Sequence, residues 1–175
     1  VGIFTNLSHD HLDYHKNMKD YLHSKLLLFK DILKEKGTII TDTDIKQYGV
    51  IKKIQRKRRL KIFTIGSKSN VFEVLNHKIF KNFQSLEIKY NKKIYKLRIN
   101  LYGSIQIKNL LMAILASKVC GLKIKNVFDK IEKIKSVEGR LQLIRTLPNQ
   151  SKIFLDYAHT PDALKNAILS LREHF

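Results

Sequence analysis

The sequence is poor in several residue types that organise small proteins. Among its 175 residues are one cysteine, Cys120, two prolines and no tryptophan. A single cysteine excludes an internal disulfide, which is compatible with a reducing compartment without establishing one. No run of about 18 apolar residues occurs, so the sequence offers no transmembrane helix, and no signal peptide is visible.

An initiator methionine and a phosphate-binding motif are also absent from the sequence. The first residue is Val1 and not methionine, and Val1 to Phe4 has the apolar character of a buried strand that is already under way. We therefore expect the natural protein to contain residues before Val1. The phosphate-binding pattern G-x-x-x-x-G-K-[ST] is also absent from these 175 residues.

Acidic residues are scarce beside basic ones, with 15 Asp and Glu against 34 Lys and Arg and a net charge of +19. A nucleic-acid-binding module would explain this balance, because Lys and Arg neutralise phosphates. The basic residues are spread along the whole chain, however, and only Lys52 to Lys61 forms a cluster, without aromatic residues for base stacking. We favour lysine-rich solvated faces, whose field would still attract anionic nucleotides.

The first part of the chain alternates strand and helix patterns. Hydrophobic residues make up 43% and charged residues 28%, as in globular proteins. Apolar segments predict strands, and apolar residues at helical spacing predict helices between them. The expected order is strand 1–5, helix 17–34, strand 38–40, helix 45–57 and strand 61–65. Such an alternation predicts a parallel sheet.

The rest of the chain changes character after residue 70. β-Branched and aromatic residues predict three antiparallel strands with a turn at Asn91-Lys92, at 72–79, 85–90 and 93–101. We then expect a helix at 103–119, a helix at 124–134, strands at 140–146 and 152–156, and a helix at 160–171. The predicted fold class is α/β, with a mostly parallel sheet, flanking helices and a small antiparallel subsheet, followed by the start of a second α/β domain.

A polar segment between the first strand and the first helix is a candidate metal site. Open α/β sheets place ligands at this position. His11 and His15 are four residues apart, so both could lie on one helical face and bind a metal, with Asp10 and Asp13 beside them. The segment lacks the glutamate of a zincin motif, and a histidine near a helix start is often only a surface or capping residue.

Lys25 lies in the most apolar part of its predicted helix. Such a lysine usually extends its amine to water. The functional alternative is a desolvated amine that reacts with carbon dioxide, and the carbamate so formed would supply oxygen ligands suited to magnesium.

Two later segments carry groups suited to a nucleotide. Gln106 and Asn109 are three apart at the front of a helix, and their amides can donate and accept together, as reading adenine requires. Asp156 closes an apolar strand, where a carboxylate can bind ribose hydroxyls, and Arg140 could contact a phosphate. Each residue also has an ordinary structural explanation.

Taken together, these segments resemble one family. Residues 5–15 (TNLSHDHLDYH) are similar to the TNL-x-x-DHLDYH signature of the Mur ligases, and Lys25 falls where that family has its carbamylated lysine. Gly139-Arg140 resembles its arginine motif. Residues 156–164 (DYAHTPDAL) resemble the form found in the branch that adds the third amino acid of the peptidoglycan peptide. The motifs occur in the family order over essentially the whole chain.

The resemblance implies a role for several residues. It makes His11 and carbamylated Lys25 the magnesium ligands, with Asp10 and Asp13 near His11. Contacts to ATP would come from the remaining matched positions, Gln106, Asn109, Arg140, Asp156 and His159, with Lys25 and Arg140 as catalytic groups. Gln106 departs from the family, which usually has asparagine there.

The resemblance also implies a reaction and a domain organisation. ATP would phosphorylate the terminal carboxylate of UDP-N-acetylmuramoyl-L-alanyl-D-glutamate, and a diamino acid would attack the acyl phosphate. Residues 1–137 would belong to the central ATP-binding domain and 138–175 to the beginning of the C-terminal domain. The implied protein is a cytoplasmic monomer without a membrane or nucleic-acid partner. Since the phosphate-binding loop is missing, we expect these 175 residues alone to be inactive.

Other interpretations remain open at this point. A related ligase of the superfamily, such as a folylpolyglutamate, cyanophycin or later Mur ligase, would share the chemistry and differ in acceptor. A degenerate homologue would have lost catalysis, although His11, Lys25, Arg140 and Asp156 are all retained. The alternative outside the ligases is a basic nucleic-acid-binding module.

Overall fold

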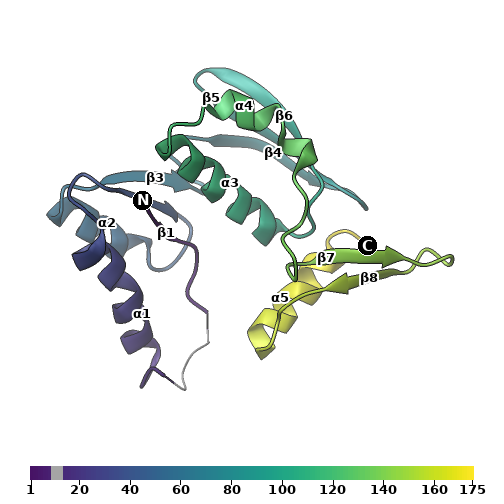
Figure 1. Ribbon diagram of the computed structural model, residues 1–175, viewed down its shortest axis with the longest axis horizontal. Coiled ribbons are helices and arrows are strands. Elements are labelled where there is room, and N and C mark those ends of the chain that lie inside the picture. The colour runs from purple at the N-terminus through teal and green to yellow at the C-terminus, as the bar shows by residue number, and fades with distance from the viewer. Residues whose placement is uncertain (9–13) are drawn as a thin grey trace. The chain divides into compact units, whose positions relative to one another are not determined.

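The computed structural model describes residues 1–8 and 14–175 (Figure 1). The chain divides into two compact units. The first unit comprises Val1–Glu73 and Lys108–Ile124, and the second comprises Val74–Ile107 and Lys125–Phe175. Among the described residues, no helix has both the length and the apolar character needed to cross a membrane.

The sheet of the first unit is parallel, as the sequence predicts. Its strands are β1 (Gly2–Phe4), β2 (Thr38–Asp42) and β3 (Lys61–Ile65), in the order β1-β2-β3. β2 extends two residues beyond the expected 38–40. The extra ladder pairs, Thr41 with Thr64 and Asp42 with Ile65, carry Asp42 to the carboxyl edge of the sheet.

Two helices connect these strands. Asn17 caps α1 (Met18–Leu27) by accepting hydrogen bonds from the amides of Lys19 and Asp20. The chain continues as a π-helical turn over Leu28–Ile32. α2 covers Tyr48–Lys57, so it begins three residues later than expected and ends at the expected residue. α1 and α2 lie on the same side of the sheet (Figure 1). The core between helices and sheet is apolar: Phe4, Leu26, Phe29, Leu33, Ile39, Ile51, Ile54 and Leu60.

α3 (Ser104–Val119) ends where the sequence predicts. Gly121 has φ +95°, and the amide of Leu122 reaches back to the carbonyl of Ser117, which closes the helix with a left-handed residue. From Lys108 onward the helix belongs to the first unit. Ile39 and Ile40 are adjacent on β2 and both fully buried, so both faces of the sheet are covered.

The second unit contains the expected antiparallel subsheet. Its strands are β4 (Glu73–Ile79), β5 (Gln84–Tyr90) and β6 (Lys93–Ile99). Asn91 and Lys92 both have positive φ, and they form the predicted turn between the paired ends of β5 and β6.

The helix expected at 124–134 is interrupted. α4 covers only Ile124–Phe128, and a 3₁₀ turn follows at Ile131–Lys133. The side-chain amide of Asn100, directly after β6, donates to the carbonyl of Glu132 in this turn. Phe128 packs against Tyr95 with ring centroids 4.9 Å apart. These contacts to the subsheet override the local helical preference.

A hairpin and a helix complete the second unit. β7 (Gln142–Thr146) pairs antiparallel with β8 (Lys152–Leu155), and α5 covers Pro161–Arg172. Thr160 caps α5 through its hydroxyl, and Pro161 occupies the first turn, as predicted. The strand expected from residue 140 begins only at 142, because Leu141 has φ +46° and turns the chain before the ladder starts.

Candidate functional site

The predicted metal ligand His11, together with Asp10 and Asp13, lies outside the described residues. Within the described part of the chain, no group of three or more His, Cys, Asp or Glu side chains could hold a metal ion. His15 stacks on Tyr21 with ring centroids 4.9 Å apart, and its Nδ1 lies 3.6 Å from a carboxylate oxygen of Asp20. His15 therefore packs against α1. The magnesium site stays a prediction.

Lys25 lies at the carboxyl end of β1, the edge at which α/β sheets bind ligands. The side chain is half-buried, and its Nζ donates to the backbone carbonyl of Asn6 at 2.9 Å. The same nitrogen lies 5.3 Å from the ring centroid of Phe4 and 5.1 Å from that of Tyr21. The amine therefore stands between two aromatic rings, at the chain segment that leads from β1 toward the predicted metal ligand.

An ion pair with a buried carboxylate lies at the same edge of the sheet and was not anticipated from the sequence. Asp42 is 1% exposed, and its Oδ2 lies 2.7 Å from the Nζ of Lys108 on α3. Its other oxygen accepts a hydrogen bond from the amide of Asp44 at 2.8 Å. The acidic turn at 42–44 was visible in the sequence, but nothing there pairs Asp42 with a lysine from a distant helix.

Asp44 joins the ends of β2 and β3. Its carboxylate accepts hydrogen bonds from the hydroxyl and the amide of Ser67. The Ser67 hydroxyl is the main reason that the pKa of Asp44 lies below its ordinary value, and the Ser67 amide, the Thr43 hydroxyl and the charge of Lys108 act in the same direction against desolvation. Gly66 permits this close approach, because a Cβ there would lie 2.3 Å from an oxygen of Asp42.

The predicted adenine-reading amides lie on α3. Gln106 is half-buried and Asn109 is exposed. The turn before them is held by Gln84 of β5, which is fully buried and donates to the carbonyls of Leu101 and Gly103 at 2.8 and 3.1 Å. The backbone amide of Gln106 also donates to the carbonyl of Gly103. The front of α3 is thus anchored on the subsheet, a role for Gln84 that the sequence did not indicate.

The structure brings Arg140, Asp156 and His159 into one turn region. One carboxylate oxygen of Asp156 accepts from the amide of Leu141 at 2.8 Å, and the other accepts from the amide of Ala158 at 2.9 Å. The exposed guanidinium of Arg140 lies 6.0 Å from the ring centroid of Tyr157. Asp156 therefore ties the backbone directly after Arg140 to the segment that follows β8, and its remaining lone pairs can accept further hydrogen bonds.

His159 is exposed beside this turn. Its Nδ1 lies 3.0 Å from the carbonyl oxygen of Tyr157, and the two rings meet edge to face with centroids 5.2 Å apart. These local contacts orient the imidazole.

The basic cluster lies on and after the exposed face of α2. Ile51 and Ile54 are buried, whereas Lys52, Lys53, Arg56 and Lys57 are exposed. Arg58 is used structurally, because its guanidinium donates to the carbonyl of Phe29 at 3.1 Å.

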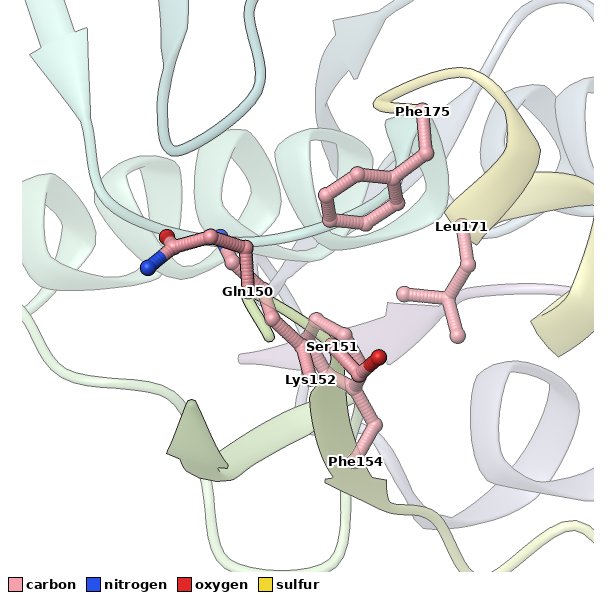
Figure 2. A pocket seen from close by; sticks show the side chains of 6 residues that line it. All are labelled: Gln150, Ser151, Lys152, Phe154, Leu171 and Phe175. Carbon is pink, nitrogen blue, oxygen red and sulfur yellow. The ribbon is translucent and has the colours of Figure 1, made fainter. Parts of the chain in front are cut away.

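A pocket of about 300 Å³ lies elsewhere in the second unit. Figure 2 shows side chains from the β7–β8 hairpin and the C-terminal segment around it: Gln150, Ser151, Lys152, Phe154, Leu171 and Phe175. None of the predicted site residues lines it.

The first unit is an α/β fold that places Lys25, Asp42 and Asp44 at the carboxyl edge of its parallel sheet. Residues 1–117 match the Mur ligase middle domain. The chain therefore belongs to the Mur ligase family, and the predicted fold class is confirmed.

Two relatives illustrate the match. A protein of Rickettsia typhi named UDP-N-acetylmuramoyl-L-alanyl-D-glutamate--2,6-diaminopimelate ligase is 36% identical over 97% of this chain and 33% of its own length. A protein of the same name from Zymomonas mobilis is 37% identical over 99% of this chain and 36% of its own length. The chain thus spans about a third of the relatives that it matches.

Solved structures show the same fold. A structure titled UDP-N-acetylmuramoyl-L-alanyl-D-glutamate--2,6-diaminopimelate ligase superposes with a TM-score of 0.77 at 25% identity, over 98% of this chain and 35% of that one. MurF from Acinetobacter baumannii gives a TM-score of 0.83 at 16% identity, over 99% of this chain and 37% of that one. The second likeness concerns the fold alone.

Proposed function

We propose that this chain is part of an ATP-dependent ligase that adds 2,6-diaminopimelate to UDP-N-acetylmuramoyl-L-alanyl-D-glutamate. The observation that carries the proposal is the match to relatives of that name over nearly the whole chain, at 36% and 37% identity. In the proposed reaction the glutamate carboxylate becomes an acyl phosphate, and an amino group of diaminopimelate displaces phosphate to form the amide.

Lys25 and His11 are proposed as the residues that hold Mg²⁺. The Lys25 ammonium would first release one proton, and carbon dioxide would then bond to the neutral amine with release of a second proton. These steps would convert a cation into a carboxylate-like oxygen ligand. The placement of the Lys25 amine supports this assignment, because its bond to the carbonyl of Asn6 holds it at the carboxyl end of β1, the edge at which α/β sheets bind ligands. Mg²⁺ bound there would offset charge on the transferred phosphoryl group.

The nucleotide contacts are proposed from the remaining residues. Gln106 and Asn109 would read the adenine edge with their amides, Asp156 would bind ribose hydroxyls, and Arg140 would contact phosphate, with His159 nearby. Asp156 supports this role because its two bonds to backbone amides hold the carboxylate in one orientation. We also propose that 1–137 belong to a central ATP-binding domain and that 138–175 begin the next domain of a cytoplasmic protein.

The test uses the protein produced from its natural gene. With ATP, Mg²⁺, the UDP-muramoyl dipeptide and diaminopimelate, Lys25→Ala should lower the rate of ADP formation by at least about a hundredfold, because the metal ligand is lost. Lys25→Arg should be equally impaired, since it keeps the charge and cannot form this carbamate. Lys19→Ala, which alters an exposed lysine on the same helix, should retain the wild-type rate. Full activity of Lys25→Ala would contradict the assignment.

A further inference from the structure

His174 is a buried histidine with a defined partner for each ring nitrogen. The residue lies two positions after the end of α5 and is 6% exposed. Nδ1 lies 2.7 Å from the carbonyl oxygen of Phe80, in the β4–β5 connection, and Nε2 lies 3.0 Å from the backbone nitrogen of Gly103, directly before α3. The ring therefore joins three segments that are far apart in the sequence.

These partners permit only one protonation state. The carbonyl of Phe80 can only accept, so Nδ1 must carry a proton. The backbone amide of Gly103 can only donate, so Nε2 must present its lone pair. A doubly protonated ring would direct an N–H group at the amide of Gly103. The contact therefore requires neutral histidine in the Nδ1–H form.

Gly103 is held on its other side as well. Its carbonyl accepts from the buried side chain of Gln84 and from the amide of Gln106. Gly103 has φ +82°, and a Cβ there would lie 2.8 Å from the Cβ of Ser170 on α5. His174 and Ser170 thus bring α5 into direct contact with the residue from which α3 starts.

We propose that His174 is a positioning residue that fixes the front of α3, including Gln106, against α5 and the β4–β5 connection. Its effect on nucleotide binding rests on the proposed function, in which Gln106 reads the base and α5 follows the ribose-binding Asp156. In this proposal His174 does not contact the nucleotide itself and acts through the backbone of Gly103.

The surroundings keep the imidazole neutral. Desolvation is the main reason that the pKa of His174 lies below its ordinary value, and the charges of Lys152 and His77 lower it further. The Phe80 carbonyl and Glu173 act in the opposite direction. Tyr102 packs against the ring with centroids 4.9 Å apart. The contact should therefore hold at neutral pH and open on acidification.

NMR of the chain tests the geometry directly. At neutral pH the ¹⁵N shifts should show the proton of His174 on Nδ1. As the pH falls, the amide resonances of Gly103 and Gln106 should move with the titration of His174. In His174→Gln these pH-dependent shifts should vanish, because an amide also offers one donor and one acceptor but does not titrate. His23→Gln, at an exposed position on α1, should keep the wild-type pattern.

Enzyme kinetics on the protein produced from its natural gene test the consequence. His174→Phe removes the bonds to both Phe80 and Gly103. It should raise the KM for ATP about three- to tenfold with a smaller change in kcat, and His174→Gln should restore the KM. A proton on Nε2 at neutral pH, or pH-dependent shifts of Gly103 that persist in His174→Gln, would overturn the proposal. Absence of ATP turnover in the wild type would overturn the proposed function, while the NMR result would still decide the role of His174.

Discussion

The carboxylate of Asp42 and the ammonium of Lys108 lie 2.7 Å apart, and only the carboxylate is buried. Asp42 ends β2 at the carboxyl edge of the parallel sheet, and Lys108 directly precedes Asn109 on α3. The ion pair therefore fixes this part of the helix to the edge of the sheet at which Lys25 also lies.

Removal of Lys108 should destabilise the chain. Among the described residues, Lys108→Met leaves the buried carboxylate with the amide of Asp44 as its hydrogen-bond partner, and we expect a loss of about 1–3 kcal/mol in the free energy of unfolding. The expected loss is smaller than for a fully buried pair because the lysine side chain is half exposed. Urea unfolding should show Lys123→Met, an exposed lysine, near wild type. Equal stability of the two variants would contradict the prediction.

Gly66 and Gly121 form a matched pair for a test of local crowding. Both have strongly positive φ, +96° and +95°, so alanine strains the backbone similarly at each. Only at Gly66 would the new Cβ collide, at 2.3 Å from Asp42 and 2.6 Å from Thr43, whereas nothing lies within 4 Å at Gly121. Gly121→Ala should cost about 1 kcal/mol, and Gly66→Ala at least about 2 kcal/mol more. Similar losses in urea unfolding would show that the turn at Asp42 is not crowded.

Asp156 should stabilise the turn that carries Arg140. Asp156→Ala removes the acceptors of the Leu141 and Ala158 amides, and we expect a loss of about 1–3 kcal/mol together with faster hydrogen exchange at those two amides. Asp129→Ala, an exposed aspartate in the same unit, provides the control. If exchange at Leu141 were unchanged in Asp156→Ala, the carboxylate would not hold this turn.

Asp44 should make the first unit sensitive to acid. The Ser67 hydroxyl lowers the pKa of Asp44 from 3.8, so the unfolded chain takes up the proton first. This contribution to stability is complete above about pH 4, the unfolded value, and is lost as the pH falls through the lower folded value. NMR titration should show the pKa of Asp44 rising toward 3.8 in Ser67→Ala. An unchanged pKa would exclude the Ser67 hydroxyl as the main cause.

The architecture was largely predictable because its signals are local. Apolar strands and helical spacing placed β3 at its observed bounds, and the positive-φ turn at Asn91-Lys92 was visible as a break between two strand patterns. The errors arose where distant groups override local preference. The helix expected over 124–134 is replaced by α4 and a 3₁₀ turn that contacts the subsheet through Asn100 and Phe128, and the turn fixed by Asp156 delays β7.

The site was predictable only as a set of candidates. Motifs identified Lys25, Arg140 and Asp156, but not the contacts that hold them. Asp42 with Lys108 and His174 with Gly103 depend on packing between segments that are distant in the sequence. Single residues such as Lys108 carry no local signal of a long-range partner. The predicted roles of all the site residues remain predictions: His11, Lys25, Gln106, Asn109, Arg140, Asp156 and His159.

Product analysis tests the central claim most directly. The protein produced from its natural gene should be incubated with ATP, Mg²⁺, UDP-N-acetylmuramoyl-L-alanyl-D-glutamate and equal concentrations of diaminopimelate and L-lysine. Mass spectrometry should show the UDP-muramoyl tripeptide that contains diaminopimelate, with one ADP formed per product. Absence of any tripeptide, or a product that contains only lysine, would contradict the proposed activity.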